Sequence, residues 1–180
     1  MRVAVVGSSG SGKTTLAKRL EDELGLPRIE LDAINWGPDW LNRSVEARDD
    51  FIADVDAAIG AATWVCDGNY EAVRLRIWAR ATHLIWLDFD RSVIMPRLFK
   101  RSLQRALDKT ELWEGTGNRE QFGKWLEKDH PLRWAWDTWA RRRRQFEELL
   151  AQPAFGHLAQ YRVGHPRDLE AAITALKAAA

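Results

Sequence analysis

A glycine-rich segment near the start of the chain has the residue types and the spacing that bind phosphate groups. Residues 7–14 read GSSGSGKT, which satisfies the pattern G-x-x-x-x-G-K-[ST] at each fixed position. Its glycines let successive backbone N–H groups turn inward and form a concave anion nest. Lys13 supplies a mobile positive charge for the β- and γ-phosphates of a nucleotide such as ATP, and the Thr14 hydroxyl can ligate Mg²⁺. The predicted nucleotide-binding residues of this P-loop are Gly7, Ser8, Ser9, Gly10, Ser11, Gly12, Lys13, Thr14 and Thr15.

A basic segment in the middle of the chain is a second candidate for chemistry. Residues 1–90 hold 10 lysines and arginines against 15 aspartates and glutamates, whereas residues 91–145 hold 14 against 7. Arg97, Arg101 and Arg105 are spaced by four residues, so a helix would present them on one face. Such a row can neutralise charge on a transferring phosphoryl group, or it can be a solvated surface. The whole segment fits either a polyanion such as nucleic acid or a small anion such as the phosphates of ATP.

The apolar pattern predicts the elements that must position these residues. Short apolar runs alternate with helical periodicity, which is typical of an α/β protein with a parallel sheet. The predicted strands cover residues 2–6, 28–31, 64–66, 83–89 and 157–163, and the predicted helices cover 13–24, 44–59 with Ser44 as its cap, 91–107, 132–150, and a last one ending at 176. The run Arg141–Arg144 spreads around its helix at about 100° per residue, so only one or two of these arginines can face one pocket. The length fits a single domain over residues 1–180, with a lid or insert over about 97–145.

Composition points to a protein of the cytoplasm. No apolar run reaches the ~20 residues that span a bilayer, and the N-terminus has no recognisable signal peptide. The single cysteine, Cys66, excludes an intrachain disulfide and lies in an apolar run, where it is expected to pack.

Three segments make the chain resemble a known family. They are GSSGSGKTTLAKRL at residues 7–20, LDAINWGPDW at 31–40 and WVCDGNY at 64–70, and the basic FKRSLQR follows at 99–105. Together they resemble the FlaR-related (DNA topology modulation) P-loop proteins of the adenylate and shikimate kinase-like group. The resemblance implies a five-stranded parallel sheet with the order 2-3-1-4-5 and helices on both faces. In such a sheet, ligands bind at the carboxyl end of the first strand.

Two carboxylates acquire expected roles from this resemblance. Asp32 and Asp67 end the second and third strands, which the implied order puts beside the P-loop. Asp32 is similar in position to the substrate-binding aspartate of shikimate-type kinases, where it could orient an attacking hydroxyl. Asp67-Gly68 looks like the Asp-Gly of adenylate kinases, in which the aspartate holds a metal-bound water, but Glu71 stands where those kinases would carry an arginine. Each aspartate could instead cap a strand end or a turn.

Other side chains are expected to bind the acceptor or the nucleotide base. Trp36, Asn69 and Tyr70 are predicted to bind the acceptor, with aromatic walls suited to a ring-bearing or apolar molecule. The aromatic rings could equally cover the edge of the sheet. In related kinases the loop after the fifth strand holds the adenine base, so the resemblance places Arg167 there, where its guanidinium could stack on the ring.

These observations support two hypotheses about function. The first is a Mg²⁺-dependent kinase that transfers phosphoryl from ATP to an unidentified small molecule. Its predicted catalytic residues are Lys13, Asp32, Arg97 and Arg101, and its predicted metal-binding residues are Thr14 and Asp67. The second is a nucleotide-dependent regulatory or nucleic-acid-binding ATPase whose basic segment contacts a polyanion. We expect no membrane partner, and the oligomeric state stays open.

Overall fold

The computed structural model describes residues 1–120, 122–125 and 130–179, which are built around a parallel sheet. Its five strands are β1 (Arg2–Gly7), β2 (Arg28–Glu30), β3 (Trp64–Asp67), β4 (His83–Leu87) and β5 (Ala159–Val163). They lie in the order β2-β3-β1-β4-β5, with β1 pairing in parallel to both β3 and β4. The predicted fold class and strand order are therefore confirmed. The strand order reverses at β1, and in sheets of this kind ligands bind outside the carboxyl ends of the strands at such a point.

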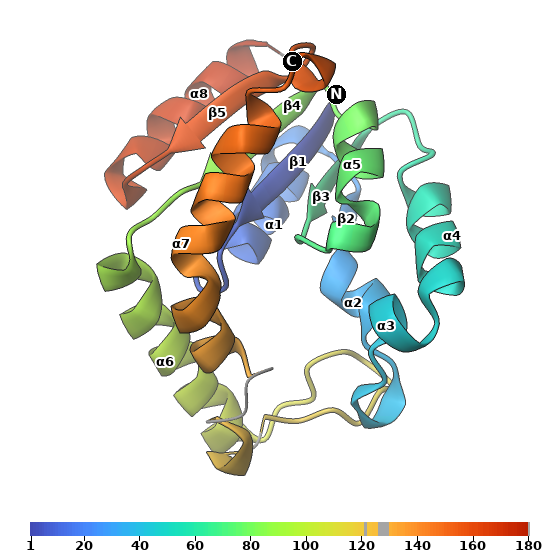
Figure 1. Cartoon of the computed structure of the whole chain (residues 1–180), viewed down its shortest axis with the longest axis vertical. Helices are drawn as coiled ribbons and strands as arrows, with labels where there is room; N and C mark the ends of the chain where they lie inside the picture. Colours follow the sequence, from blue (N-terminus) through green and yellow to red (C-terminus); the bar gives the residue numbers. More distant parts are fainter. Residues whose placement is uncertain (121, 126–129, 180) are drawn as a thin grey trace.

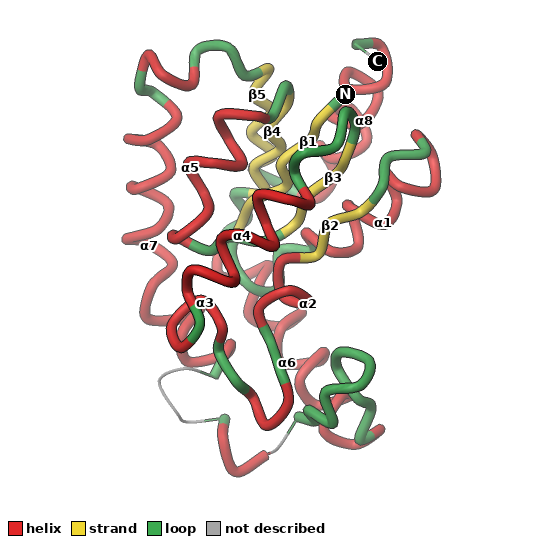
Figure 2. The backbone as a smooth tube through the Cα atoms, turned by 90° about the vertical axis from the view of Figure 1, so that its right-hand side faces the viewer, coloured by secondary structure: helices red, strands yellow, loops and turns green. Residues whose placement is uncertain are grey.

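Helices cover both faces of the sheet. They are α1 (Lys13–Leu24), α2 (Leu31–Asn35), α3 (Arg43–Glu46), α4 (Arg48–Ala58), α5 (Glu71–Arg80), α6 (Arg91–Asp108), α7 (Pro131–Leu150) and α8 (Leu169–Ala178). Helices α1 and α8 pack on one face, whereas α4, α5 and α7 lie on the other, as Figures 1 and 2 show. None of the described helices is both long and apolar enough to cross a membrane.

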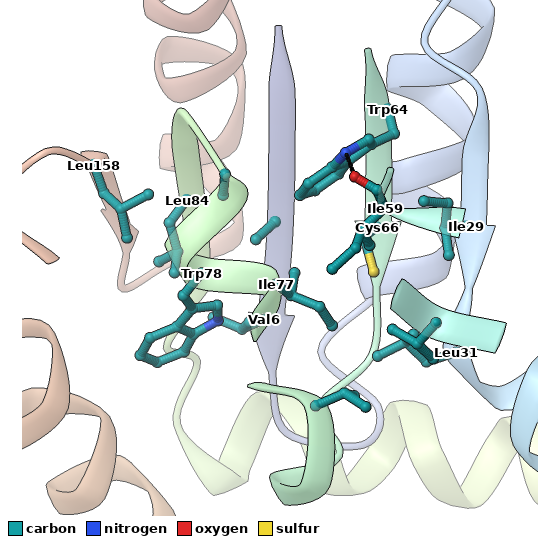
Figure 3. Packing of buried hydrophobic residues seen from close by; sticks show 14 of the residues in the cluster. Val6, Ile29, Leu31, Ile59, Trp64, Cys66, Ile77, Trp78, Leu84 and Leu158 are labelled. Atoms are coloured by element: carbon teal, nitrogen blue, oxygen red, sulfur yellow. Dashed lines mark hydrogen bonds between the residues drawn. The ribbon is translucent and has the colours of Figure 1, made fainter. Parts of the chain in front are cut away.

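Alternating side chains of the central strands build a core on each face. Val3 and Val5 of β1 belong to the cluster with α1 and α8, whereas Ala4 and Val6 belong to the cluster with α4 and α5. In the second cluster the fully buried Trp64 donates its indole N–H to the carbonyl of Ile59 at 3.1 Å, which satisfies its polar atom (Figure 3). Cys66 lies in the same cluster, and burial raises the pKa of its thiol. It packs as a small apolar side chain.

Several expected elements have other bounds in the structure. The fourth strand ends at Leu87, two residues before the expected end, and the fifth begins at Ala159, two residues after the expected start. The second strand ends at Glu30, because α2 begins at Leu31, one residue before Asp32. The helix expected from Ser44 to Ile59 is divided into α3 and α4 at Ala47, whose φ of −138° and ψ of 54° are not helical. Ser44 therefore lies inside α3 and does not cap the longer helix, so that prediction was wrong.

The chain that follows α6 crosses to the other side of the molecule and docks on the loop after α2 (Figure 1). Asn118 is buried and holds the two segments together. Its Oδ1 accepts the backbone N–H of Trp40 at 2.9 Å, and its Nδ2 donates to the carbonyl of Gly37 at 2.8 Å. Trp113 stacks on Trp36 with ring centroids 5.9 Å apart. Residues 113–118 of the predicted insert are thus fixed to the segment that follows α2, and the action of the insert as a lid stays a prediction.

Candidate active site

The phosphate loop joins β1 to α1, and its three glycines have positive φ angles. These are 151° at Gly7, 81° at Gly10 and 95° at Gly12, a region that side chains with a Cβ rarely adopt. Two of them also lie close to neighbouring elements. A Cβ at Gly7 would lie 2.7 Å from the carbonyl oxygen of Leu87 in β4, and one at Gly10 would lie 2.8 Å from that of Ile94 in α6. The loop is therefore held between β4 and α6 in a shape that only glycine allows.

Lys13 begins α1 directly after this loop. The first backbone N–H groups of a helix have no partner within the helix, so this terminus attracts anions. The Lys13 ammonium donates to the carbonyl of Ser8 at 3.2 Å. Burial lowers the pKa of Lys13 to about 8, although Asp32 and Asp67 act to raise it. The ammonium and both predicted carboxylates therefore lie close enough for their charges to interact.

Asp67 ends β3 and is buried, with its Oδ1 lacking a hydrogen-bond partner among the described residues. Burial raises the pKa of Asp67, and the Thr14 hydroxyl and Lys13 act to lower it. A buried carboxylate oxygen without a donor is costly unless a cation binds it. A hydroxyl and a carboxylate are also the hard oxygen donors that Mg²⁺ takes beside phosphates and water. Thr14 and Asp67 thus fit the metal predicted for them.

Asp32 lies in the first turn of α2 and is exposed to solvent. Its Oδ1 accepts a hydrogen bond from the hydroxyl of Tyr70 at 2.7 Å. Burial raises the pKa of Tyr70, and the negative charge of Asp32 raises it further, so the phenol stays protonated and keeps donating. This pair brings α2 to the loop that follows β3. The exposed carboxylate of Asp32 is thus held in place on one oxygen while it stays accessible to solvent.

The arginines expected on one face of α6 differ in their burial. Arg101 is partly buried, and its Nε has no hydrogen-bond partner among the described residues. Burial lowers the pKa of Arg101 to about 10, with Arg105 adding to the fall and Asp32 opposing it. Arg97 is exposed instead, and its guanidinium lies 5.6 Å from the centroid of the Phe89 ring. Arg101 therefore belongs to the charge cluster around Lys13, and Arg97 is not among the groups that shift that lysine.

Two arginines on the opposite face of the sheet from α1 also approach the site. Arg142 in α7 donates to the carbonyl of Asn69 at 3.1 Å, and its charge lowers the pKa of Lys13. Arg74 in α5 is buried and lines a small cavity together with Asn69 and Tyr70. The sequence indicated only that one or two of Arg141–Arg144 could face a pocket. It gave no sign of which one, because that depends on the rotation of α7.

The other predicted binding residues lie at different places. Tyr70 and Asn69 adjoin Asp32 and Arg142, as described above. Trp36 is the C-cap residue of α2 and forms an aromatic cluster with Trp40 and Trp113, and its contact with an acceptor stays a prediction. Arg167 is largely exposed after β5 and pairs with Asp168 at 3.6 Å. Trp113 was missed from the sequence, because its partners are more than 70 residues away in the chain.

The sheet order, the phosphate loop and the flanking helices define the fold of the P-loop kinases of the shikimate kinase type. A shikimate kinase from Acinetobacter baumannii in complex with shikimate superposes with a TM-score of 0.59 and 17% identity, covering 99% of this chain and 93% of that one. For a shikimate kinase from Bacteroides thetaiotaomicron the TM-score is 0.54 and the identity 16%, with 98% and 96% of the chains covered. An unliganded sugar kinase from Janibacter sp. HTCC2649 superposes with a TM-score of 0.51 and 20% identity, covering 98% of this chain and 94% of that one.

No protein-family model matches the sequence, and no curated protein matches it. At these identities the likeness to solved structures shows the fold alone. It agrees with the shikimate kinase-like half of the resemblance seen in the sequence. The resemblance to the FlaR-related proteins stays a prediction.

Proposed function

We propose that the protein is a Mg²⁺-dependent kinase that transfers the γ-phosphoryl group of ATP to a hydroxyl group of a small molecule. The observation that carries this proposal is the convergence of Lys13, Asp32 and Arg101 at the mouth of the phosphate loop. These are a phosphate-binding cation, a carboxylate that can take a proton, and a second cation for the transferring group. The fold shared with shikimate kinases and a sugar kinase supports the same class of reaction.

The roles of the residues follow from their placement. The acceptor oxygen forms a bond to the γ-phosphorus, the bond from that phosphorus to the bridging oxygen of ADP breaks, and Asp32 takes the hydroxyl proton. Tyr70, which donates to Asp32, fixes the orientation of that carboxylate. Lys13 and Arg101 offset the negative charge on the phosphate oxygens. Thr14 and Asp67 would hold Mg²⁺, which when bound neutralises charge on the β- and γ-phosphates.

The rival hypothesis, a nucleic-acid-binding ATPase, is less well supported by the same residues. Arg101 and Arg142 of the basic segment are partly buried toward the phosphate loop, and Arg143 pairs with Asp88 at 3.0 Å and Asp90 at 3.3 Å. These side chains are therefore not available to a polyanion on the surface. Binding of duplex DNA at low salt, weakening steeply as salt is added, would favour the rival.

The proposal is tested by ADP formation in the presence of a panel of hydroxyl-bearing metabolites, with ATP and GTP compared. We expect one class of acceptor to raise ADP formation well above the basal hydrolysis of ATP. With that acceptor, Asp32→Asn should lower kcat by roughly 10²- to 10⁴-fold and leave the affinity for a non-hydrolysable ATP analogue unchanged. Asp50→Asn, an exposed carboxylate on α4, is the matched control. A panel with no active acceptor, or full activity of the Asp32 variant, would argue against a kinase of this mechanism.

A further inference from the structure

A buried hydrogen bond joins the segment that follows Asn118 to the start of α7. Nε2 of His130 lies 2.5 Å from Oε1 of Glu120, and each of the two side chains is only 7% exposed. His130 directly precedes α7, and its Nδ1 accepts the backbone N–H of Leu132 at 3.3 Å, which caps the helix. The pair therefore has a fixed place in the fold, although the proposed phosphoryl transfer does not use it.

The cap of α7 decides how the hydrogen is shared between His130 and Glu120. A backbone N–H can only donate, so Nδ1 carries no hydrogen, and the ring must then be neutral with its hydrogen on Nε2. Nε2 therefore donates to Glu120, which accepts as a carboxylate. The pair keeps the negative charge of Glu120 in a buried place, and such a charge is costly unless a cation attracts it.

Aromatic rings hold this pair against α6, beside which α7 begins (Figure 1). The Trp125 ring lies 6.1 Å from the His130 ring between centroids, at an interplanar angle of 26°. Trp125 also contacts Phe99 of α6, with centroids 5.5 Å apart. Phe99 precedes Arg101 by two residues, which is about 3 Å along the helix axis. The pair is thus placed at the level of the turn of α6 that carries Arg101.

The negative charge of Glu120 acts on Arg101. Burial and the neighbouring Arg105 lower the pKa of Arg101 to about 10, whereas the carboxylates of Asp32 and Glu120 oppose that fall. The guanidinium is therefore attracted from two elements, α2 and the chain that follows α6. Its Nε has no hydrogen-bond partner among the described residues, so this N–H stays free to bind a phosphate oxygen.

We propose that Glu120 is a positioning residue for Arg101, and that His130 holds Glu120 in the orientation that this requires. The pair keeps the guanidinium near the phosphate loop before a nucleotide binds, so less conformational freedom is lost when the γ-phosphate arrives. The inference rests on the role of Arg101 in the proposed function and adds the residues that place it.

The proposal is tested by binding, without turnover. Each protein is titrated calorimetrically, in the presence of Mg²⁺, with a non-hydrolysable ATP analogue or with ADP. Glu120→Gln removes the charge and keeps the volume and the hydrogen bond, because the amide oxygen still accepts from His130. We expect it to weaken binding of the ATP analogue by about 5- to 20-fold and to leave ADP binding unchanged. Glu114→Gln, an exposed glutamate between α6 and Glu120, is the matched control and should change neither affinity.

A second background separates positioning from simple electrostatics. Loss of a negative charge near bound phosphates would by itself tighten their binding. Arg101→Gln alone should weaken binding of the analogue, and adding Glu120→Gln to it should cause no further loss. His130→Gln keeps an N–H donor for Glu120 and should bind the analogue as wild type does, whereas His130→Leu lacks that donor and should behave as Glu120→Gln does.

The proposal is overturned if Glu120→Gln alone binds the analogue as tightly as wild type or more tightly, or if Arg101→Gln has no effect. An equal loss of affinity for the analogue and for ADP would also overturn it, because Glu120 would then have a structural role. So would an equal loss with and without Arg101, because Glu120 would then act through another group. The kinase proposal fails separately, through the absence of any active acceptor.

Discussion

Replacing Lys13 by methionine should stabilise the ligand-free protein while abolishing its affinity for nucleotide. The ammonium has an ordinary pKa of 10.5 and a pKa of about 8 in the folded chain, because burial disfavours its charged form. At pH 7 the lysine is charged in the folded and unfolded states alike, so the folded state carries the whole cost of that burial. Each pKa step corresponds to about 1.4 kcal/mol, which makes this cost roughly 3 kcal/mol.

The pH dependence separates this cost from a simple packing effect. Since the folded pKa is lowered, the cost is fully present below pH 8, diminishes between pH 8 and 10.5, and vanishes above the unfolded pKa. Lys13→Met should therefore raise the free energy of unfolding at pH 7 by up to roughly 3 kcal/mol. For a domain of this size that is about 6 to 12 °C in Tm. Near pH 10.5 the gain should disappear.

Thermal unfolding followed by circular dichroism measures the gain, at pH 7 and pH 10.5, with and without a non-hydrolysable ATP analogue and Mg²⁺. The analogue should stabilise the wild-type protein and leave the variant unaffected. Lys18→Met, an exposed lysine on the same helix, is the control and should change Tm little at either pH. A variant that is less stable than wild type at pH 7, or a gain of equal size at both values of pH, would refute the reasoning.

Substitutions at three further places test the geometry of the site and of the segment docked beside it. Gly10→Ala should destabilise the protein by more than Gly12→Ala and abolish binding of the ATP analogue. The reason is that a Cβ at Gly10 meets the backbone of α6, whereas a Cβ at Gly12 meets nothing within 4 Å. Tm and calorimetric titration with the analogue compare the two variants. Asp67→Asn should remove the Mg²⁺ dependence of analogue binding without lowering Tm, since the carboxylate is buried and its pKa raised; a lower Tm would contradict this. Asn118→Ala should lower the free energy of unfolding by about 1–3 kcal/mol, because two hydrogen bonds are lost. It should also change the near-ultraviolet circular dichroism of the tryptophan cluster. Unchanged spectra would show that docking of the segment does not depend on Asn118.

The parts of the fold set by local pattern could be predicted from the sequence. The continuous valines of β1 predict a strand that is buried on both faces. The helical spacing of apolar residues in α1 predicts a helix that is buried on one face. The glycine pattern of the phosphate loop leaves little conformational choice. The strand order came from the resemblance, because pairing partners are not a local property.

The parts that depend on contacts distant in the chain could not be predicted. Asn118 binds Trp40 and Gly37 some 80 residues away, and no periodicity reveals such a partner. Which arginine of the run faces the site depends on how α7 is rotated about its own axis when it packs on the sheet, and in the structure it is Arg142 that contacts Asn69. Ser44 has the usual chemistry of a helix cap, but the chain leaves helical geometry at Ala47, and only tertiary packing shows this.

The contact of the phosphate loop with α6 links the nucleotide-binding residues directly to the helix that carries Arg101. Gly10 rests against the helix between Ile94 and Leu98. Pro96 lies at the middle of this contact, and it has no N–H to bond to the preceding turn, so the helix is weakest there. The helix continues beyond this contact, and at 1.5 Å per residue Arg105 lies about 10 Å from Leu98 along its axis. Because the backbone of Gly10 has no free space on the side of α6, the prediction that this helix acts as a lid implies that a phosphate in the loop and the position of Arg101 are coupled through this contact.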